Sequence, residues 1–175
     1  VVAAAEEGDV VILSDGTYAG NKTIEITKSI TIKAANSGAA FLSQYQFAVP
    51  AGSTVADIVL EGLYAEYDDT GDNGKYFFQV NTATSVVNNL TIRDCRISRF
   101  GRGVVRGTTT GAKRDNLLID NCMLEENSND SSNAGYANIK PQKLNAKSIQ
   151  IMNTTFYNSR AAIFRYEGTE SLTLN

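Results

Sequence analysis

One short phrase recurs along the chain and constrains the fold more than any other feature of the sequence. It alternates apolar and variable residues, continues through an Asn or Asp, and ends on an apolar residue. Clear copies lie at Leu90–Ile97 (LTIRDCRI), Leu117–Leu124 (LLIDNCML) and Ile149–Phe156 (IQIMNTTF), with weaker ones at Ile58–Ala65 and Leu172–Asn175. The third residues of the copies, Leu60, Ile92, Ile119, Ile151 and Leu174, are 32, 27, 32 and 23 residues apart. A strand-like repeat of this length predicts a solenoid in which each turn of the chain forms one rung.

We therefore expect an all-β fold, a right-handed single-stranded parallel β-helix (a pectate-lyase-like solenoid), formed by one domain over residues 1–175. Each rung is expected to contain two strands, of which the first carries the phrase. The second strands are predicted at Tyr76–Val80, Gly103–Arg106, Tyr136–Lys140 and Ala162–Arg165. The residues before Gly8 are expected to form a short N-terminal helix that caps the first rung. Because the last copy of the phrase is partial, we expect the solenoid to continue beyond Asn175.

Composition excludes several classes of function. The net charge of the 175 residues is −3, and a nucleic-acid-binding domain is expected to be basic. The absence of histidine removes the usual general base and the commonest metal ligand, and two cysteines alone cannot complete a structural zinc site. No run of 18 apolar residues is present, so we expect no membrane insertion.

The Asn or Asp of the phrase, at Asp94, Asn121 and Asn153, is predicted to mark a bend between strands, because these residues tolerate left-handed backbone conformations. A ladder of ligand-binding amides is the alternative. Cys95 and Cys122 hold equivalent places in consecutive copies, so they are predicted to stack on neighbouring rungs as small buried apolar residues. A disulfide is the alternative for this pair, and it would indicate an oxidising compartment.

Candidate binding residues emerge when the second strands are aligned by their apolar positions Phe78, Val105, Ile139 and Phe164. The residues that follow these positions are Gln79, Arg106, Lys140 and Arg165. Because side chains alternate along a strand, they are predicted to point outward, in a column with a spacing of about 4.8 Å. Three stacked cations repel one another unless anions neutralise them, so the column suits an anionic polysaccharide such as a polyuronate. Alternatively, nearby acids (Asp94, Glu125, Glu126 and Glu167) neutralise the column.

Two further features concern ligands. The candidate sugar-contacting aromatic residues are Tyr64, Tyr67, Tyr136, Tyr157 and Tyr166, with packing at a rung edge as the alternative. The segment from Tyr67 to Gly74 has the composition of a Ca²⁺-binding loop, although it lacks the EF-hand spacing and is also typical of ordinary turns. We expect no cofactor or resident metal, with Ca²⁺ at this loop as the alternative.

Several segments resemble polysaccharide lyase family 6, which includes chondroitinase B and alginate lyases. GDVVILSDGTYAG at Gly8–Gly20 is similar to the first coil of that family, NIKPQK at Asn138–Lys143 to its catalytic-lysine segment, and FRYEG at Phe164–Gly168 to its catalytic-arginine segment. The resemblance implies a uronate lyase acting by β-elimination, with Arg165 and either Lys143 (by motif) or Lys140 (by strand alignment) as catalytic residues. The chain departs from the family at its calcium-binding acids, which are unmatched, and at Tyr166, which replaces a histidine.

A more extensive resemblance covers most of the chain. NLTIRDCRISRFGRGVVRG at Asn89–Gly107, GYANIK at Gly135–Lys140 and IQIMNTTFYNS at Ile149–Ser159 are similar to an uncharacterised right-handed β-helix domain family of surface and secreted proteins of Bacteroides-type bacteria. This resemblance implies an extracellular or outer-membrane location and a glycan-handling protein, as a monomer or as one module of a longer polypeptide. We expect a domain that binds acidic polysaccharide, with a uronate lyase and a structural spacer as the alternatives.

Overall fold

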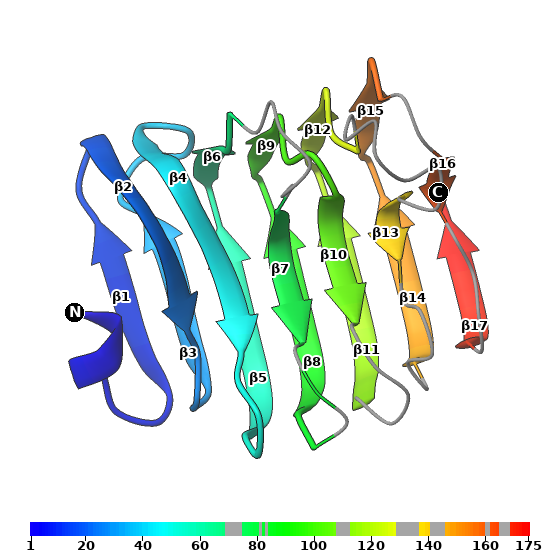
Figure 1. Cartoon of the computed structure of the whole chain (residues 1–175), viewed down its shortest axis with the longest axis horizontal. Helices are drawn as coiled ribbons and strands as arrows, with labels where there is room; N and C mark the ends of the chain where they lie inside the picture. The colour runs from blue at the N-terminus through cyan, green and yellow to red at the C-terminus, as the bar shows by residue number, and fades with distance from the viewer. Residues whose placement is uncertain are drawn as a thin grey trace.

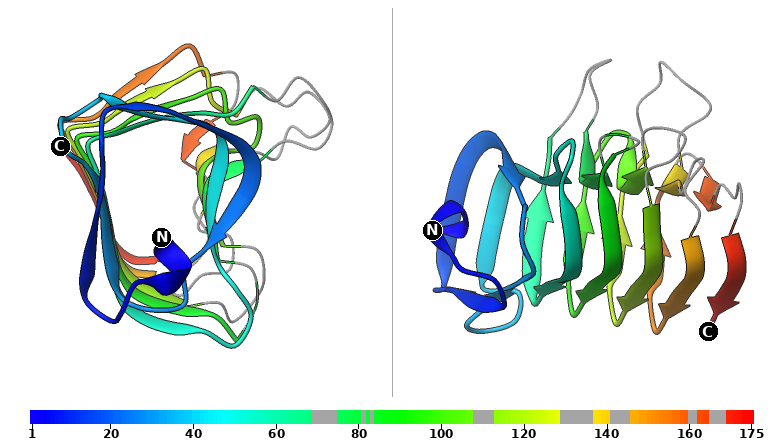
Figure 2. Two further views of the ribbon diagram at one scale, coloured as in Figure 1. Left: turned by 90° about the vertical axis from the view of Figure 1, so that its left-hand side faces the viewer. Right: turned by 90° about the horizontal axis from the view of Figure 1, so that it is seen from below.

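The computed structural model describes residues 1–68, 75–80, 82, 84–107, 113–128, 137–140, 146–159, 162–164 and 169–175. In this part of the chain the fold is all-β, and every strand pair is parallel, as the repeated phrase predicts. Successive turns of the chain lie side by side along one long axis (Figure 1). Seen along that axis, the strands curl around a central core (Figure 2).

The strands form two sheets. The first sheet contains β1 (Asp9–Leu13), β3 (Ile30–Ala34), β5 (Thr54–Glu61), β8 (Val86–Arg93), β11 (Lys113–Asp120), β14 (Ala146–Met152) and β17 (Thr169–Leu174). The second contains β2 (Gly16–Glu25), β4 (Ala40–Val49), β6 (Leu63–Glu66), β7 (Tyr76–Val80), β9 (Arg96–Ser98), β10 (Gly103–Gly107), β12 (Met123–Glu125), β13 (Ala137–Lys140), β15 (Thr155–Tyr157) and β16 (Ala162–Phe164).

The second sheet divides into two arms at β4. The first half of β4 pairs with β6, and its last residues pair with β7. One arm then runs through β6, β9, β12 and β15, and the other runs through β7, β10, β13 and β16. Later rungs therefore contain three strands, such as β8, β9 and β10, and the prediction of two strands per rung was incomplete. The missing strand is the short segment that follows the Asn or Asp of the phrase.

The repeated phrase supplies the core. Its third residues stack in register across the first sheet, since Leu60 pairs with Ile92, Ile92 with Ile119, and Ile119 with Ile151. Leu60, Ile92 and Ile119 are fully buried. β-Branched and leucine side chains at every second position match the period of a strand, so one face of each strand enters the core.

The Asn and Asp residues of the phrase mark bends, as predicted. Asp94, Asn121 and Asn153 have φ values of 56°, 50° and 49°, and Gly62 holds the equivalent place with a φ of 66°. The Asn121 Nδ2 donates to the Asp94 Oδ1 at 2.6 Å, and the Asn153 Nδ2 donates to the Asp120 Oδ1 at 2.9 Å. These amides therefore join neighbouring rungs.

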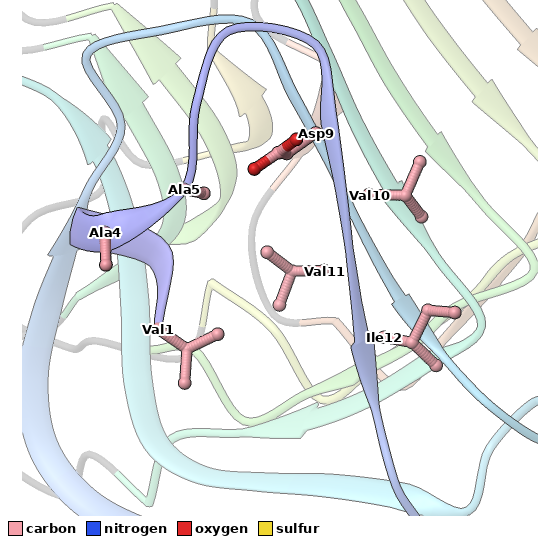
Figure 3. A pocket seen from close by; sticks show the side chains of 7 residues that line it. All are labelled: Val1, Ala4, Ala5, Asp9, Val10, Val11 and Ile12. Atoms are coloured by element: carbon pink, nitrogen blue, oxygen red, sulfur yellow. The ribbon is translucent and has the colours of Figure 1, made fainter.

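The predicted N-terminal helix is absent. Only a single 3₁₀ turn forms, at Val2–Ala4, and Gly8 with a φ of 86° leads into β1. Six or seven residues cannot offset the cost of nucleating an α-helix without more packing than this end of the molecule provides. Ala5 nevertheless packs into the core, and Ala4, Ala5 and Val11 lie around a pocket at the start of the first sheet (Figure 3).

Among the helices of the described residues, none has the length and apolar character needed to cross a membrane.

Candidate functional site

The candidate site lies on the arm formed by β7, β10 and β13, which run side by side (Figure 1). Val105 pairs with both Phe78 and Ile139, so Arg106 pairs with both Gln79 and Lys140. The backbone register of these three strands therefore agrees with the alignment made from the sequence. Ile139 pairs in turn with Phe164 of β16, the residue before Arg165.

Arg106 is half-buried, and its surroundings leave part of its hydrogen-bonding capacity unused. The guanidinium carbon lies 5.2 Å from the centre of the Tyr76 ring, which is a cation–π distance. The Nε atom is buried and has no hydrogen-bond partner among the residues that the structure describes. An arginine has five N–H donors in a planar fork, so a buried donor without a partner is costly unless a ligand or water accepts from it.

Two of the four acids expected to neutralise the column, Glu125 and Asp94, have other partners. Glu125 forms an ion pair with Arg96, with an Arg96 Nη2 to Glu125 Oε2 distance of 2.7 Å. Asp94 accepts from Asn121 at the bend on the other side of the rung. Within the described ranges, no carboxylate forms an ion pair with Arg106. Glu167 lies outside the described residues.

Several predicted site residues lie outside the described part of the chain. These are Tyr136, Lys143, Arg165 and Tyr166. Lys140 is described by its backbone pairing alone. Of the candidate calcium loop only Tyr67 and Asp68 are described, and the Asp68 Oδ1 accepts from the Arg99 Nη2 at 2.6 Å.

The other arm of the second sheet carries a polar and aromatic network around Tyr64, a candidate sugar-contacting residue whose partners in the network were not predicted. The rings of Phe41 and Tyr64 lie 4.7 Å apart, and the Arg96 guanidinium lies 4.7 Å from the Tyr64 ring centre on the next rung. The Tyr64 hydroxyl donates to the Glu66 Oε2 at 3.1 Å. The short strands after the bends place Tyr64 next to Arg96 on the neighbouring rung. Aligning these segments in the sequence would have predicted this pair.

The contacts within this network shift the pKa values of Tyr64 and Arg96. Partial burial raises the pKa of Tyr64, and its hydrogen bond to the Glu66 carboxylate raises it further. The hydrogen bond to Glu125 raises the pKa of Arg96. Both groups are thereby held in their ordinary protonation states at neutral pH, and they contribute fixed dipoles and charges rather than a proton-transfer site.

Two buried asparagines were also missed. Asn127 is fully buried; its Oδ1 accepts from the Phe100 N–H at 2.9 Å and its Nδ2 donates to the Ile97 carbonyl at 2.8 Å. In the sequence, Asn127 begins a run of polar residues, Asn127–Asn133, which is typical of a loop. Asn138 of β13 is fully buried, and within the described part of the chain both polar atoms of its amide lack a hydrogen-bond partner. A buried amide without partners is rare in folded proteins, and Asn138 lies two residues before Lys140.

The cysteines have the predicted packing role. Cys95 and Cys122 are free and buried, at 3% and 4% exposure. Within the described residues, no group of three or more Cys, Asp or Glu side chains is placed to hold a metal.

Comparison with known proteins places the chain in context. The model of a family described as a domain of unknown function (DUF4957) matches residues 16–159. No curated protein matches the chain. Among solved structures, the chain is similar to a mutant of AlyGC, a PL6 family alginate lyase, with 15% sequence identity and a TM-score of 0.43. The similarity covers 99% of this chain and 38% of the lyase chain, so the chain spans well under half of that enzyme's length.

Proposed function

We propose that this chain, which belongs to the DUF4957 family, binds an anionic polysaccharide on the outer face of β7, β10 and β13. Arg106, Lys140 and Arg165 would supply the positive charges, and Gln79, Tyr136 and Tyr166 would contact the sugars. A polyuronate suits such a column because a guanidinium can hold a carboxylate by two parallel hydrogen bonds.

The observation that carries the proposal is the unused capacity of Arg106. Among the described residues its buried Nε has no acceptor, and Glu125, one of the acids expected to neutralise the column, pairs with Arg96 instead. The strand register, which sets Lys140 beside Arg106, supports the proposal by bringing a second cation to the neighbouring rung. Like charges on adjacent strands repel each other, and an anionic ligand would neutralise them.

We extend the proposal to the setting of the domain. We propose that the strands coil as a right-handed β-helix, since parallel crossover connections are almost always right-handed. We also propose that the domain works outside the cell, at a bacterial surface, as a monomer or as one module of a longer glycan-handling polypeptide. The similarity of the chain to an alginate lyase fold is consistent with polysaccharide as the ligand class.

The direct test compares two arginine variants in binding to alginate, chondroitin sulfate and polygalacturonate, with neutral dextran as the control ligand. Arg106→Ala should weaken binding by about 10–100-fold, because a charge-assisted hydrogen bond contributes about 1.5–3 kcal/mol. Arg93→Ala is the matched control, because Arg93 lies on the first sheet and already pairs with Glu61 at 2.7 Å. Equal affinity of both variants and the wild type for every anionic glycan would refute the site.

The same incubations distinguish binding from cleavage. A lyase that acts by β-elimination produces an unsaturated uronyl group that absorbs in the ultraviolet. Binding without growth of this absorbance is the expected result, and its growth would convert the proposal from a binding domain into a lyase. If none of the anionic glycans binds, the domain is a structural spacer instead.

A further inference from the structure

Several buried polar atoms on the later rungs have no hydrogen-bond partner among the described residues. They are the Arg106 Nε, the Ser128 Oγ, the Ser159 Oγ and both polar atoms of the Asn138 amide. Asn138 differs from the others, because its side chain is fully buried and neither its donor nor its acceptor is used. Buried polar groups in folded proteins are almost always hydrogen-bonded, so this amide requires a physical explanation.

Asn127 shows what the same side chain does when it supports the fold. It is as buried as Asn138, but its Oδ1 accepts from the Phe100 N–H at 2.9 Å and its Nδ2 donates to the Ile97 carbonyl at 2.8 Å. The two amides therefore differ in their hydrogen bonds rather than in their burial. Asn138 gives up its hydrogen bonds to water on folding and gains none within the described residues, so it lowers the stability of the fold.

The backbone register places Asn138 beside the proposed glycan site. Val105 of β10 pairs with Ile139 of β13. Asn138 therefore lies beside Val104, two residues before Arg106 along the strand direction. Because side chains alternate along a strand, Asn138 and Arg106 are on the same face of two neighbouring strands. That face thus combines the unused Nε donor of a half-buried arginine with the unused donor and acceptor of an amide.

An amide provides a kind of recognition that a cation does not. Its Nδ2 donates and its Oδ1 accepts, so one Asn138 side chain can bond a carboxylate or ring oxygen and a hydroxyl at the same time. A uronate residue carries a carboxylate and free hydroxyls on one ring, whereas dextran sulfate presents sulfate oxygens in place of most hydroxyls. A buried group that is built to bond a hydroxyl rejects ligands without one, because its polar atoms are then left unpaired.

We propose that Asn138 is a specificity-determining residue of the glycan site, and that its amide selects uronate residues over other anionic sugars. This role rests on the proposed function, because it assigns Asn138 to the site built around Arg106. The Arg106 guanidinium attracts the carboxylate, and the Asn138 amide donates to an oxygen of the same sugar and accepts from one of its hydroxyls. The ligand supplies the hydrogen-bond partners of the amide, and their low-dielectric surroundings strengthen these bonds.

Thermal unfolding tests whether the amide serves the fold. Asn138→Leu replaces it by an apolar group of similar size, so the melting temperature should rise by about 2–6 °C. Asn127→Leu is the matched control, and its melting temperature should fall, because two hydrogen bonds to the backbone are lost. If Asn138→Leu lowers the melting temperature as much as Asn127→Leu does, the Asn138 amide supports the fold and the proposed role is overturned.

Binding to polygalacturonate and to dextran sulfate tests the selection itself. We expect Asn138→Leu to weaken binding to polygalacturonate by about 10–100-fold and to change binding to dextran sulfate by less than about threefold. Arg106→Ala should weaken binding to both polymers, because both are anionic. Asn138→Ala, which has a smaller side chain, gives the same readout if the leucine variant does not fold.

The outcomes separate this role from the proposed function. If Asn138→Leu keeps the preference of the wild type for polygalacturonate, or if the wild type binds both polymers equally, the role of Asn138 is overturned and the anionic site at Arg106 stands. A wild type that binds neither polymer overturns both.

Discussion

Replacement of Asn127 by alanine should destabilise the fold far more than the polar character of its sequence context suggests. The side chain is fully buried and bridges two backbone groups, the Phe100 N–H at 2.9 Å and the Ile97 carbonyl at 2.8 Å. It thereby fixes the turn that holds Phe100, whose ring packs 5.5 Å from that of Phe77 in the core. Asn127→Ala would leave both backbone groups without these bonds, in a place that water does not reach.

The magnitude follows from the number of groups affected. Each buried group that loses its partner costs about 1–3 kcal/mol, so two cost about 2–6 kcal/mol. We expect about 3 kcal/mol, because a carbonyl has a second lone pair and is less dependent on one donor. For a domain of this size each kcal/mol lowers the melting temperature by about 2–4 °C, so the melting temperature should fall by about 6–12 °C.

Thermal unfolding followed by circular dichroism measures this effect. The matched control is Asn116→Ala, since Asn116 is exposed on β11 and its Nδ2 donates only to the exposed Asn89 Oδ1. It should change the stability by less than about 0.5 kcal/mol. Asn127→Asp tests the burial of this side chain through the pH dependence of stability. Burial raises the folded-state pKa of the introduced carboxyl, so the free energy of unfolding of this variant should fall as the pH rises. Equal melting temperatures for Asn127→Ala and Asn116→Ala would refute the reasoning.

Three further outcomes are expected. Asn121→Ala should lower the free energy of unfolding, measured in urea, by about 1–2 kcal/mol, because a φ of 50° is unfavourable for alanine and the bond to Asp94 is lost. Asn121→Gly should lower it less, and equal losses would contradict this account of the bend. Cys95 in the Cys122→Thr variant should react slowly with a thiol reagent up to about pH 9, because burial raises the pKa of Cys95; a rate like that of an unfolded control would argue against its burial. Glu125→Gln should cost about 0.5 kcal/mol or less and leave glycan affinity unchanged, because its pair with Arg96 is partly exposed and does not include Arg106. A gain in affinity would show that Glu125 screens the site.

The first sheet could be predicted from the sequence because its signal is periodic. Ile92, Ile119 and Ile151 recur in the same local pattern, and parallel pairing follows from the repeat, since identical rungs stack most simply in register. The bends at Asp94, Asn121 and Asn153 could be predicted for a local reason, because the required backbone conformation selects these residue types. The register of Gln79, Arg106 and Lys140 followed from one strong apolar position in each strand.

The remaining features depend on contacts between segments far apart in the sequence, and the sequence contains no local signal for them. The strands β9, β12 and β15 are only three residues long, too short for a period to be visible. The burial of Asn127 depends on Phe100 and Ile97, which lie one rung earlier. The expected N-terminal helix failed because local propensity cannot outweigh the cost of nucleation in so short a segment.

The bends also determine how a disturbance spreads through the molecule. Each bend is bonded to the rung beside it: the Asp94 N–H donates to the Asp120 carbonyl at 3.1 Å, and the Asn121 N–H donates to that of Met152 at 3.1 Å. Stability in such a molecule is close to a sum of nearest-neighbour couplings along one axis. Weakening one central rung would then divide the solenoid into two cooperative blocks, and amide hydrogen exchange would show the boundary between them at the altered bend.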